Sequence, residues 1–190
     1  HPNEVGLYTT ADGYGPTGTF TIGVPVDVFL VLTKPTEVEN GNIPITHVGA
    51  FECRVYFDPV PDNDLYLINV VLPPTGINIG RFQNIDDGLL EFVVGVGDPA
   101  PVTDESIVLV TFTFLNTSTH VTEVTLRPIP DVPQIPGEMS FLGGLPPYDQ
   151  EDIRIMHPIS GSHDVPVFLF NGEAIPVKTE SFGSVKALYR

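Results

Sequence analysis

The sequence predicts an all-β protein, an antiparallel β-sandwich of the jelly-roll kind that carries a short C-terminal helical tail. Three observations support this prediction. Apolar and polar residues alternate along many short segments, which is the side-chain period of a strand. Turn-forming pairs such as Asp12-Gly13 and Asn171-Gly172 separate those segments. The 20 prolines and 18 glycines lie mostly between the segments or at their starts, where sheets tolerate them.

The strand-like segments follow one another along most of the chain. The clearest is 106–115, in which Val108, Phe112 and Phe114 share one face while Thr111 and Thr113 point the other way. The full set of predicted strands is 5–8, 20–32, 48–57, 65–72, 90–96, 106–115, 121–127, 153–156 and 164–170. The proline-rich stretch 128–147 predicts a long surface connection, with a short edge strand at 139–142.

The last residues differ from the rest of the chain. Apolar residues recur there at helical spacing, with Lys and Arg toward the end, where they suit a helix dipole. These apolar residues are Phe182, Val185, Leu188 and Tyr189. We therefore divide the chain into an N-terminal strand segment (1–17), which is a candidate for exchange between chains, a sandwich domain (18–175) and a tail (176–190).

Charge sets the tail apart from the sandwich. Residues 178–190, called here the tail segment, hold three cations (Lys178, Lys186 and Arg190) and one carboxylate (Glu180). Its net charge is therefore +2, and since the whole chain carries −16, the other 177 residues carry −18. A cationic amphipathic segment suits docking on that anionic body, or on the body of a neighbouring copy.

The acidic composition excludes several classes of function. Phosphate backbones require a basic face, so nucleic acid is not an expected partner, and anionic membranes are disfavoured for the same reason. No apolar run approaches the roughly 20 residues needed to span a bilayer, so we expect no membrane insertion. The single cysteine, Cys53, lies in a predicted strand and is expected to be a buried thiol.

The first residue is histidine, which predicts an N-terminus made by a protease, most simply a signal peptidase. The expected location is therefore extracellular or on the cell surface. An N-terminal histidine also offers copper its α-amino group and imidazole, so His1 is a candidate copper ligand in a histidine brace. The chain lacks the tryptophans and disulfides of secreted copper enzymes, which makes this a minor alternative.

No catalytic motif stands out, and we predict a protein that is not an enzyme and has no cofactor. The letters of a hydrolase triad occur at 160–164, but they are adjacent in sequence, whereas a triad converges in space. Two acidic turns offer oxygen ligands to Ca²⁺, through Asp62 and Asp64 and through Asp86 and Asp87, although neither matches an EF-hand. Asn116-Thr117-Ser118 is a glycosylation sequon at a predicted strand end.

Several segments together resemble the cohesin-like sandwich domains of bacterial secreted proteins. They comprise an early long strand, a strand of Gly-Ala-Phe type, an apolar-Pro-Pro-Thr-Gly turn and a late Val-Leu-Val-Thr-Phe-Thr-Phe strand. These segments are 26–33, 49–57, 65–80, 90–102 and 107–115. The sequence Phe-Gly-Ser-Val-Lys-Ala-Leu-Tyr-Arg at 182–190 is similar to tails of exported proteins of Gram-negative bacteria. The resemblance implies a jelly-roll sandwich outside the cell, but no residue matches a dockerin contact.

These features favour a structural function, in which the chain is a subunit of a self-assembling extracellular filament or sheath. Copies would be linked by strand donation through Val5 and Leu7 or by docking of the tail. The predicted tail contacts are Phe182, Val185, Leu188, Tyr189 and Arg190. The first alternative is a monomeric cohesin-like or carbohydrate-binding module, with surface glycans as ligands and exposed tyrosines as the platform. The tyrosine candidates are Tyr8, Tyr14, Tyr66 and Tyr148.

Overall fold

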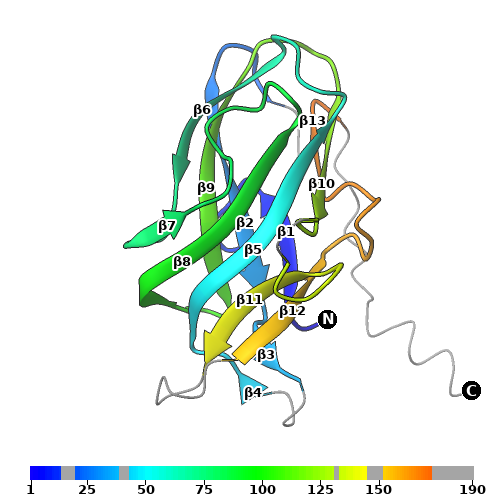
Figure 1. The fold of residues 1–190 in the computed structure, drawn as a ribbon. Helices are drawn as coiled ribbons and strands as arrows, with labels where there is room; N and C mark the ends of the chain where they lie inside the picture. The colour runs from blue at the N-terminus through cyan, green and yellow to red at the C-terminus, as the bar shows by residue number, and fades with distance from the viewer. Residues whose placement is uncertain (14–19, 39–42, 131–132, 145–151, 173–190) are drawn as a thin grey trace, which may run out of the picture.

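The computed structural model describes residues 1–13, 20–38, 43–130, 133–144 and 152–172. Every regular element in these ranges is a β-strand, and the strands form two packed layers, with β8 and β5 lying in front of β9 and β2 (Figure 1). The back layer contains β1 (Glu4–Tyr8), β2 (Pro25–Thr33), β9 (Ser106–Asn116) and β6 (Leu65–Val71). The front layer contains β7 (Gly76–Asn78), β8 (Leu89–Pro101), β5 (His47–Asp58), β10 (Thr122–Arg127), β11 (Met139–Gly144) and β13 (Phe168–Phe170). A separate small hairpin contains β3 (Thr36–Glu37) and β4 (Ile43–Pro44).

The long strand β5 organises the front layer. Along one edge it pairs with β8, and along the other edge it pairs with β11 over its first half and with β10 over its second half. One more strand, β12 (Asp152–Pro158), joins the two layers, because it runs antiparallel to β11 and parallel to β1. The first strand of the chain therefore lies between β12 and β2 and closes the sandwich.

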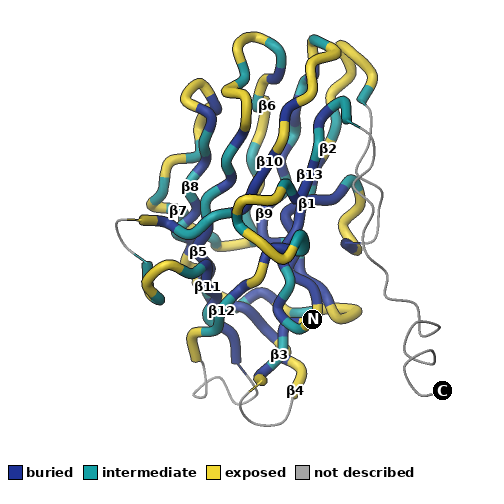
Figure 2. Tube along the Cα trace, turned by 90° about the vertical axis from the view of Figure 1, so that its right-hand side faces the viewer, coloured by how far each residue is buried: buried dark blue, intermediate teal, exposed yellow. Residues whose placement is uncertain are grey.

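Phenylalanine rings fill the space between the layers. Phe112 and Phe114 of β9 meet the rings of Phe92, Phe57 and Phe170 from the front layer, with centroids 5.6, 6.0 and 5.0 Å apart. All five side chains are buried. Since burying such a side chain contributes about 1.5–3 kcal/mol, these contacts are a main source of stability. Figure 2 shows the buried stretches along the strands and the exposed residues in the loops that join them.

The sequence-based prediction of an all-β sandwich is confirmed, and nearly every predicted strand is present within a few residues of its expected bounds. Three differences stand out. Residues 139–142 belong to β11, which is not an edge strand, because it pairs with β5 on one side and with β12 on the other. The long strand β5 has room for it beside β10. The last predicted strand shortens to β13, and β7 was not predicted at all. The predicted helical tail lies outside the described residues.

Burial of Cys53 is also confirmed. Its side chain lies in the core with no solvent exposure. Burial, with a smaller contribution from the adjacent carboxylate of Glu52, raises the pKa of the Cys53 thiol to about 12.

Candidate protein-binding face

The outer surface of the front layer carries a groove of about 620 Å³. Side chains alternate across each strand, so the residues that line the groove come from every second position of β5, β8 and β11. Cross-strand pairing then arranges these residues in rows that run across the strands. Each row has a distinct chemical character.

The first row is apolar. It crosses five strands through consecutive register pairs, in the order Ile77, Gly95, Ala50, Leu142 and Ile153. Gly95 and Ala50 form a low floor, and a side-chain atom built on Gly95 would meet nothing within 4 Å. Ile77 forms one wall, and Leu142 and Ile153 form the other, so the depth of the groove comes from small residues between large ones.

Two exposed isoleucines line the groove, Ile77 in the short strand β7 and Ile79 directly after it. The turn at the start of β7 needs Gly76, since a Cβ there would lie 2.8 Å from the Pro73 carbonyl oxygen. The Asn78 side chain fixes the strand to β8, because its Oδ1 accepts from Val93 N at 2.8 Å and its Nδ2 donates to Glu91 O at 3.0 Å. Ile77 and Ile79 are nonetheless 70% and 82% exposed. Large apolar side chains held rigidly in water mark an interaction surface.

The second row is mixed, and its central member is Glu52 of β5, between Val93 of β8 and Ser140 of β11. Glu52 is only 3% exposed, although it faces outward and lines the groove. Its Oε1 accepts hydrogen bonds from Gln134 N at 2.6 Å and from Ser140 Oγ at 2.8 Å. Its Oε2 is buried and has no hydrogen-bond partner among the described residues. Burying a carboxylate oxygen without a hydrogen-bond donor lowers the free energy of unfolding by about 1–3 kcal/mol or more.

The third row lies beyond the residues that line the groove, and it is charged. Arg54 of β5 forms an ion pair with Glu91 of β8, and the two residues are register partners. On the other side of β5, the Arg127 guanidinium lies 4.7 Å from the ring centroid of Tyr56. The groove face therefore changes from apolar at one end to cationic and ion-paired at the other. A partner with matching apolar and polar parts would bind it in one orientation only.

A second groove of about 620 Å³ lies at the N-terminal end of the sandwich, beside Pro2, Pro35 and Pro44. Lys34 and Glu105 lie on its walls, and the short β3–β4 hairpin contributes the register partners Thr36 and Pro44. It lacks the row across five strands and the exposed isoleucines that distinguish the β7–β8–β5–β11 groove. We therefore assign the candidate site to the latter.

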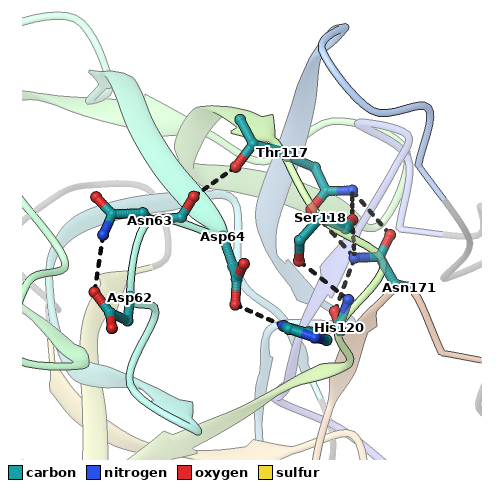
Figure 3. Close-up of polar contacts among 8 residues, drawn as sticks. Asp62, Asn63, Asp64, Thr117, Ser118, His120 and Asn171 are labelled. Atoms are coloured by element: carbon teal, nitrogen blue, oxygen red, sulfur yellow. Dashed lines mark hydrogen bonds and ion pairs between the residues drawn. The ribbon is translucent and has the colours of Figure 1, made fainter.

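The predicted calcium ligands are not brought together. Asp64 Oδ2 lies 2.9 Å from His120 Nδ1, and Asp62 Oδ1 accepts a hydrogen bond from Asn63 Nδ2 at 2.9 Å (Figure 3). The hydrogen bond from His120 is the main cause of a lowered pKa at Asp64. In the other predicted pair, Asp87 forms an ion pair with Arg81. Over the described ranges, no three His, Cys, Asp or Glu side chains gather as metal ligands.

The copper hypothesis at His1 stays a prediction. The amino group of His1 lies 3.4 Å from Glu4 Oε1. His120 pairs with Asp64, and His163 Nδ1 bonds to the Leu126 carbonyl oxygen at 2.9 Å, so these histidines are engaged elsewhere.

The remaining predicted site residues have mixed outcomes. Asn116 of the sequon is only 1% exposed, and its side chain bonds with Asn171 and with the Ser118 carbonyl oxygen, so a glycan does not fit in the folded protein. Tyr8 is buried in the sandwich, and Tyr66 lies on the edge strand β6, so these two do not form a platform. Tyr14 and Tyr148 lie outside the described residues.

The two sets of predicted assembly residues also differ. Val5 and Leu7 are buried in β1, which pairs with β2 and β12 of its own chain. Exchange of this strand between copies stays a prediction. The tail residues Phe182, Val185, Leu188, Tyr189 and Arg190 lie outside the described residues. No helix in the described part is long and apolar enough to cross a membrane.

No protein-family model and no curated protein matches this sequence. Solved structures do match its fold. A type II cohesin domain from the cellulosome of Acetivibrio cellulolyticus has a TM-score of 0.52 at 12% identity, covering 88% of this chain and 95% of that one. The second type II cohesin module of the ScaA scaffoldin, with its long C-terminal linker, has a TM-score of 0.54 at 13% identity, covering 97% and 100%.

A third match is a type II cohesin–X-dockerin complex from the same organism, with a TM-score of 0.51 at 14% identity and coverage of 90% and 100%. At such low identity these likenesses establish the fold alone. The chain is a cohesin-like β-sandwich, which confirms the expectation drawn from its strand and turn pattern.

Proposed function

We propose that this chain is a non-catalytic, extracellular protein-binding module that binds its partner on the β7–β8–β5–β11 groove. The observation that carries the proposal is the apolar row, which holds Ile77 and Ile153 exposed on either side of the floor made by Gly95 and Ala50. Apolar, concave surfaces next to a polar strip are typical of binding sites.

The fold supports a protein as the partner. One of the cohesin structures that it matches is a complex with an X-dockerin module. The groove lies on strands rather than loops, which suits recognition of a structured surface. A dockerin-type module is therefore the first partner class to test.

The polar groups of the described residues also favour binding over catalysis. Ser160 Oγ lies 2.9 Å from the carbonyl oxygens of Ser162 and Val165, and His163 bonds to the Leu126 carbonyl oxygen. The letters of a hydrolase triad thus form a turn with separate backbone partners. An unassisted serine hydroxyl is a weak nucleophile.

Binding to purified dockerin modules, measured by biolayer interferometry, tests the proposal. Ile77→Ser and Leu142→Ser remove the two walls of the groove, and each is expected to weaken binding at least tenfold. Ile68→Ser is the matched control, because Ile68 is exposed on β6 of the other layer. Equal binding by the groove variants and the wild type would refute the site, and failure to bind any module would refute the partner class.

The narrower prediction of a filament or sheath subunit depends on contacts between copies. The acidic body favours separation of copies, because like charges repel. Assembly through the termini therefore requires a specific attraction strong enough to overcome this repulsion. Sedimentation velocity over a wide range of concentration distinguishes a polymer from a single binding module.

A further inference from the structure

The groove contains one group whose chemistry is incomplete. Within the described part of the chain, Glu52 Oε2 is buried without a donor, while Oε1 of the same carboxylate accepts from Gln134 and Ser140. A carboxylate oxygen is completed best by a cationic donor, because charge-assisted hydrogen bonds are the stronger kind. The occupant of this groove should therefore present a lysine or arginine beside apolar side chains.

The residue spacing of β5 sets the distance between the apolar row and the Glu52 carboxylate. Ala50 in the apolar row and Glu52 in the mixed row are alternate residues of β5, so the rows lie about 7 Å apart. Two side chains one helical turn apart are separated by about 5–6 Å. A helical segment with a lysine one turn from an apolar residue can fill both rows at once.

The tail segment has this chemistry. At helical spacing, Lys186 lies one turn after Phe182 and nearly one turn before Tyr189. The segment carries +2, whereas the rest of the chain carries −18, so long-range attraction favours docking on the body. Lys186 of the tail segment and Glu52 of the groove are then oppositely charged partners.

The groove lies within reach of the same chain. Phe170 pairs with Thr122, next to the pair Glu123–Asp58, so β13 ends level with the end of β5. From there to Glu52 is about 20 Å along β5 and about 10 Å across two strand spacings, or about 22 Å in a straight line. Residues 173–177 extend at most about 17 Å, and a helix from 178 to 186 adds about 12 Å. An attached segment that reaches its site acts at a millimolar effective concentration, which favours its own groove over that of another copy.

We propose that the tail segment of this chain docks in its own β7–β8–β5–β11 groove, with Lys186 donating to Glu52 Oε2 and Tyr189, farther along the segment, on the apolar row. The proposal rests on the proposed function of that groove as a binding site. It adds a competitor, because an external partner must displace the segment before it binds. Partner affinity is thereby lowered by the fraction of molecules in which the groove is covered.

Alkylation of an introduced cysteine measures this cover without any partner. The full chain carrying Ile77→Cys is treated with neutral iodoacetamide, and modification is followed by mass spectrometry. We expect at least tenfold slower reaction than for Ile68→Cys, although the isoleucine replaced at 77 is the more exposed of the two in the described part. Ile153→Cys, on the opposite wall, is expected to be protected in the same way. The native Cys53 is buried and serves as the internal unreactive reference.

The charge partners are tested on the same reporters. Lys186→Glu and Glu52→Gln should each restore fast reaction at position 77, whereas Lys178→Glu, a matched change outside the apolar face, should not. A synthetic peptide of residues 178–190 added to the Lys186→Glu protein should restore protection. Equal reaction of positions 77 and 68 in the unmodified background would overturn the proposal.

Dilution separates the two possible sources of the segment. Protection that survives a hundredfold dilution supports docking within one chain. Protection that disappears on dilution would overturn it in favour of a second copy. None of these readouts involves a dockerin, so their failure leaves the proposed binding function to be judged by interferometry alone.

Discussion

Ala50 of β5 and Gly95 of β8 are register partners, and together they form the lowest part of the outer face of the front layer. Their small size is a property of the site and not of the fold. The core-facing neighbours Phe51 and Val94 are large and buried. At these positions the two strands therefore carry small residues on the outer face and large residues on the core face.

Filling this floor should separate stability from binding. Gly95→Val adds a side chain where nothing lies within 4 Å, and a β-branched residue suits a strand better than glycine. We expect thermal unfolding at an equal or higher temperature, with a gain of up to about 1 kcal/mol. Binding on the groove should fall at least tenfold. A clear fall in melting temperature would show that Gly95 is required by the backbone instead.

A second prediction concerns the joint between the layers. Arg154 of β12 forms an ion pair with Glu37 of the β3–β4 hairpin, and their side chains are only 9% and 10% exposed. Arg154→Ala removes the cation from this buried ion pair, so we expect a loss of about 3 kcal/mol in the free energy of unfolding. Urea denaturation measures this loss. Arg127→Ala is a suitable comparison, because Arg127 is 40% exposed in its pair with Asp164 and should cost 1 kcal/mol or less, roughly.

The Asp64–His120 pair predicts a dependence on acid pH. Hydrogen bonding to His120 lowers the pKa of Asp64 below its usual 3.8, so the charged form is favoured in the folded state. The contribution to stability is therefore present above pH 3.8 and is lost as the pH falls through the lower folded value. Thermal unfolding of the wild type and Asp64→Asn should differ above that range and converge below it. A difference that grows as the pH falls would contradict this assignment.

Cys53 should be inert in the folded protein. Its thiol has a pKa of about 12 and no solvent exposure, so almost no thiolate is present at neutral pH. We expect no modification by iodoacetamide at pH 8 without denaturant, and complete modification in 6 M guanidinium, roughly the concentration that unfolds stable domains. Rapid modification of the native chain would mean that the core around β5 opens readily.

Much of the fold could be predicted from the sequence, because the core follows a local rule. Val110, Phe112 and Phe114 alternate with threonines, and that pattern alone predicts a half-buried strand. β7 could not be found in this way, since a three-residue strand is too short to show a period. Its position depends on the Asn78 side chain, which binds β8.

The candidate site was beyond sequence reasoning for a different reason. Its rows join residues such as Ile77 and Leu142, which come together only through the register of four strands. Glu52 could not be singled out among the 24 acidic residues, since nothing in the sequence identifies a carboxylate whose second oxygen lacks a hydrogen-bond donor in the described part of the fold. The alternation of glycine with valine at 94–97 was the one local signal of a strand with a bare outer face.

The parallel pairing of β1 with β12 has a consequence for the order of events during synthesis. Glu4 has its register partner at His157, so the second edge of β1 stays unpaired until most of the chain has been made. Contacts between such distant residues form late and slowly. The sandwich of a chain emerging from a ribosome therefore stays incomplete, and it can close only after β12 has emerged.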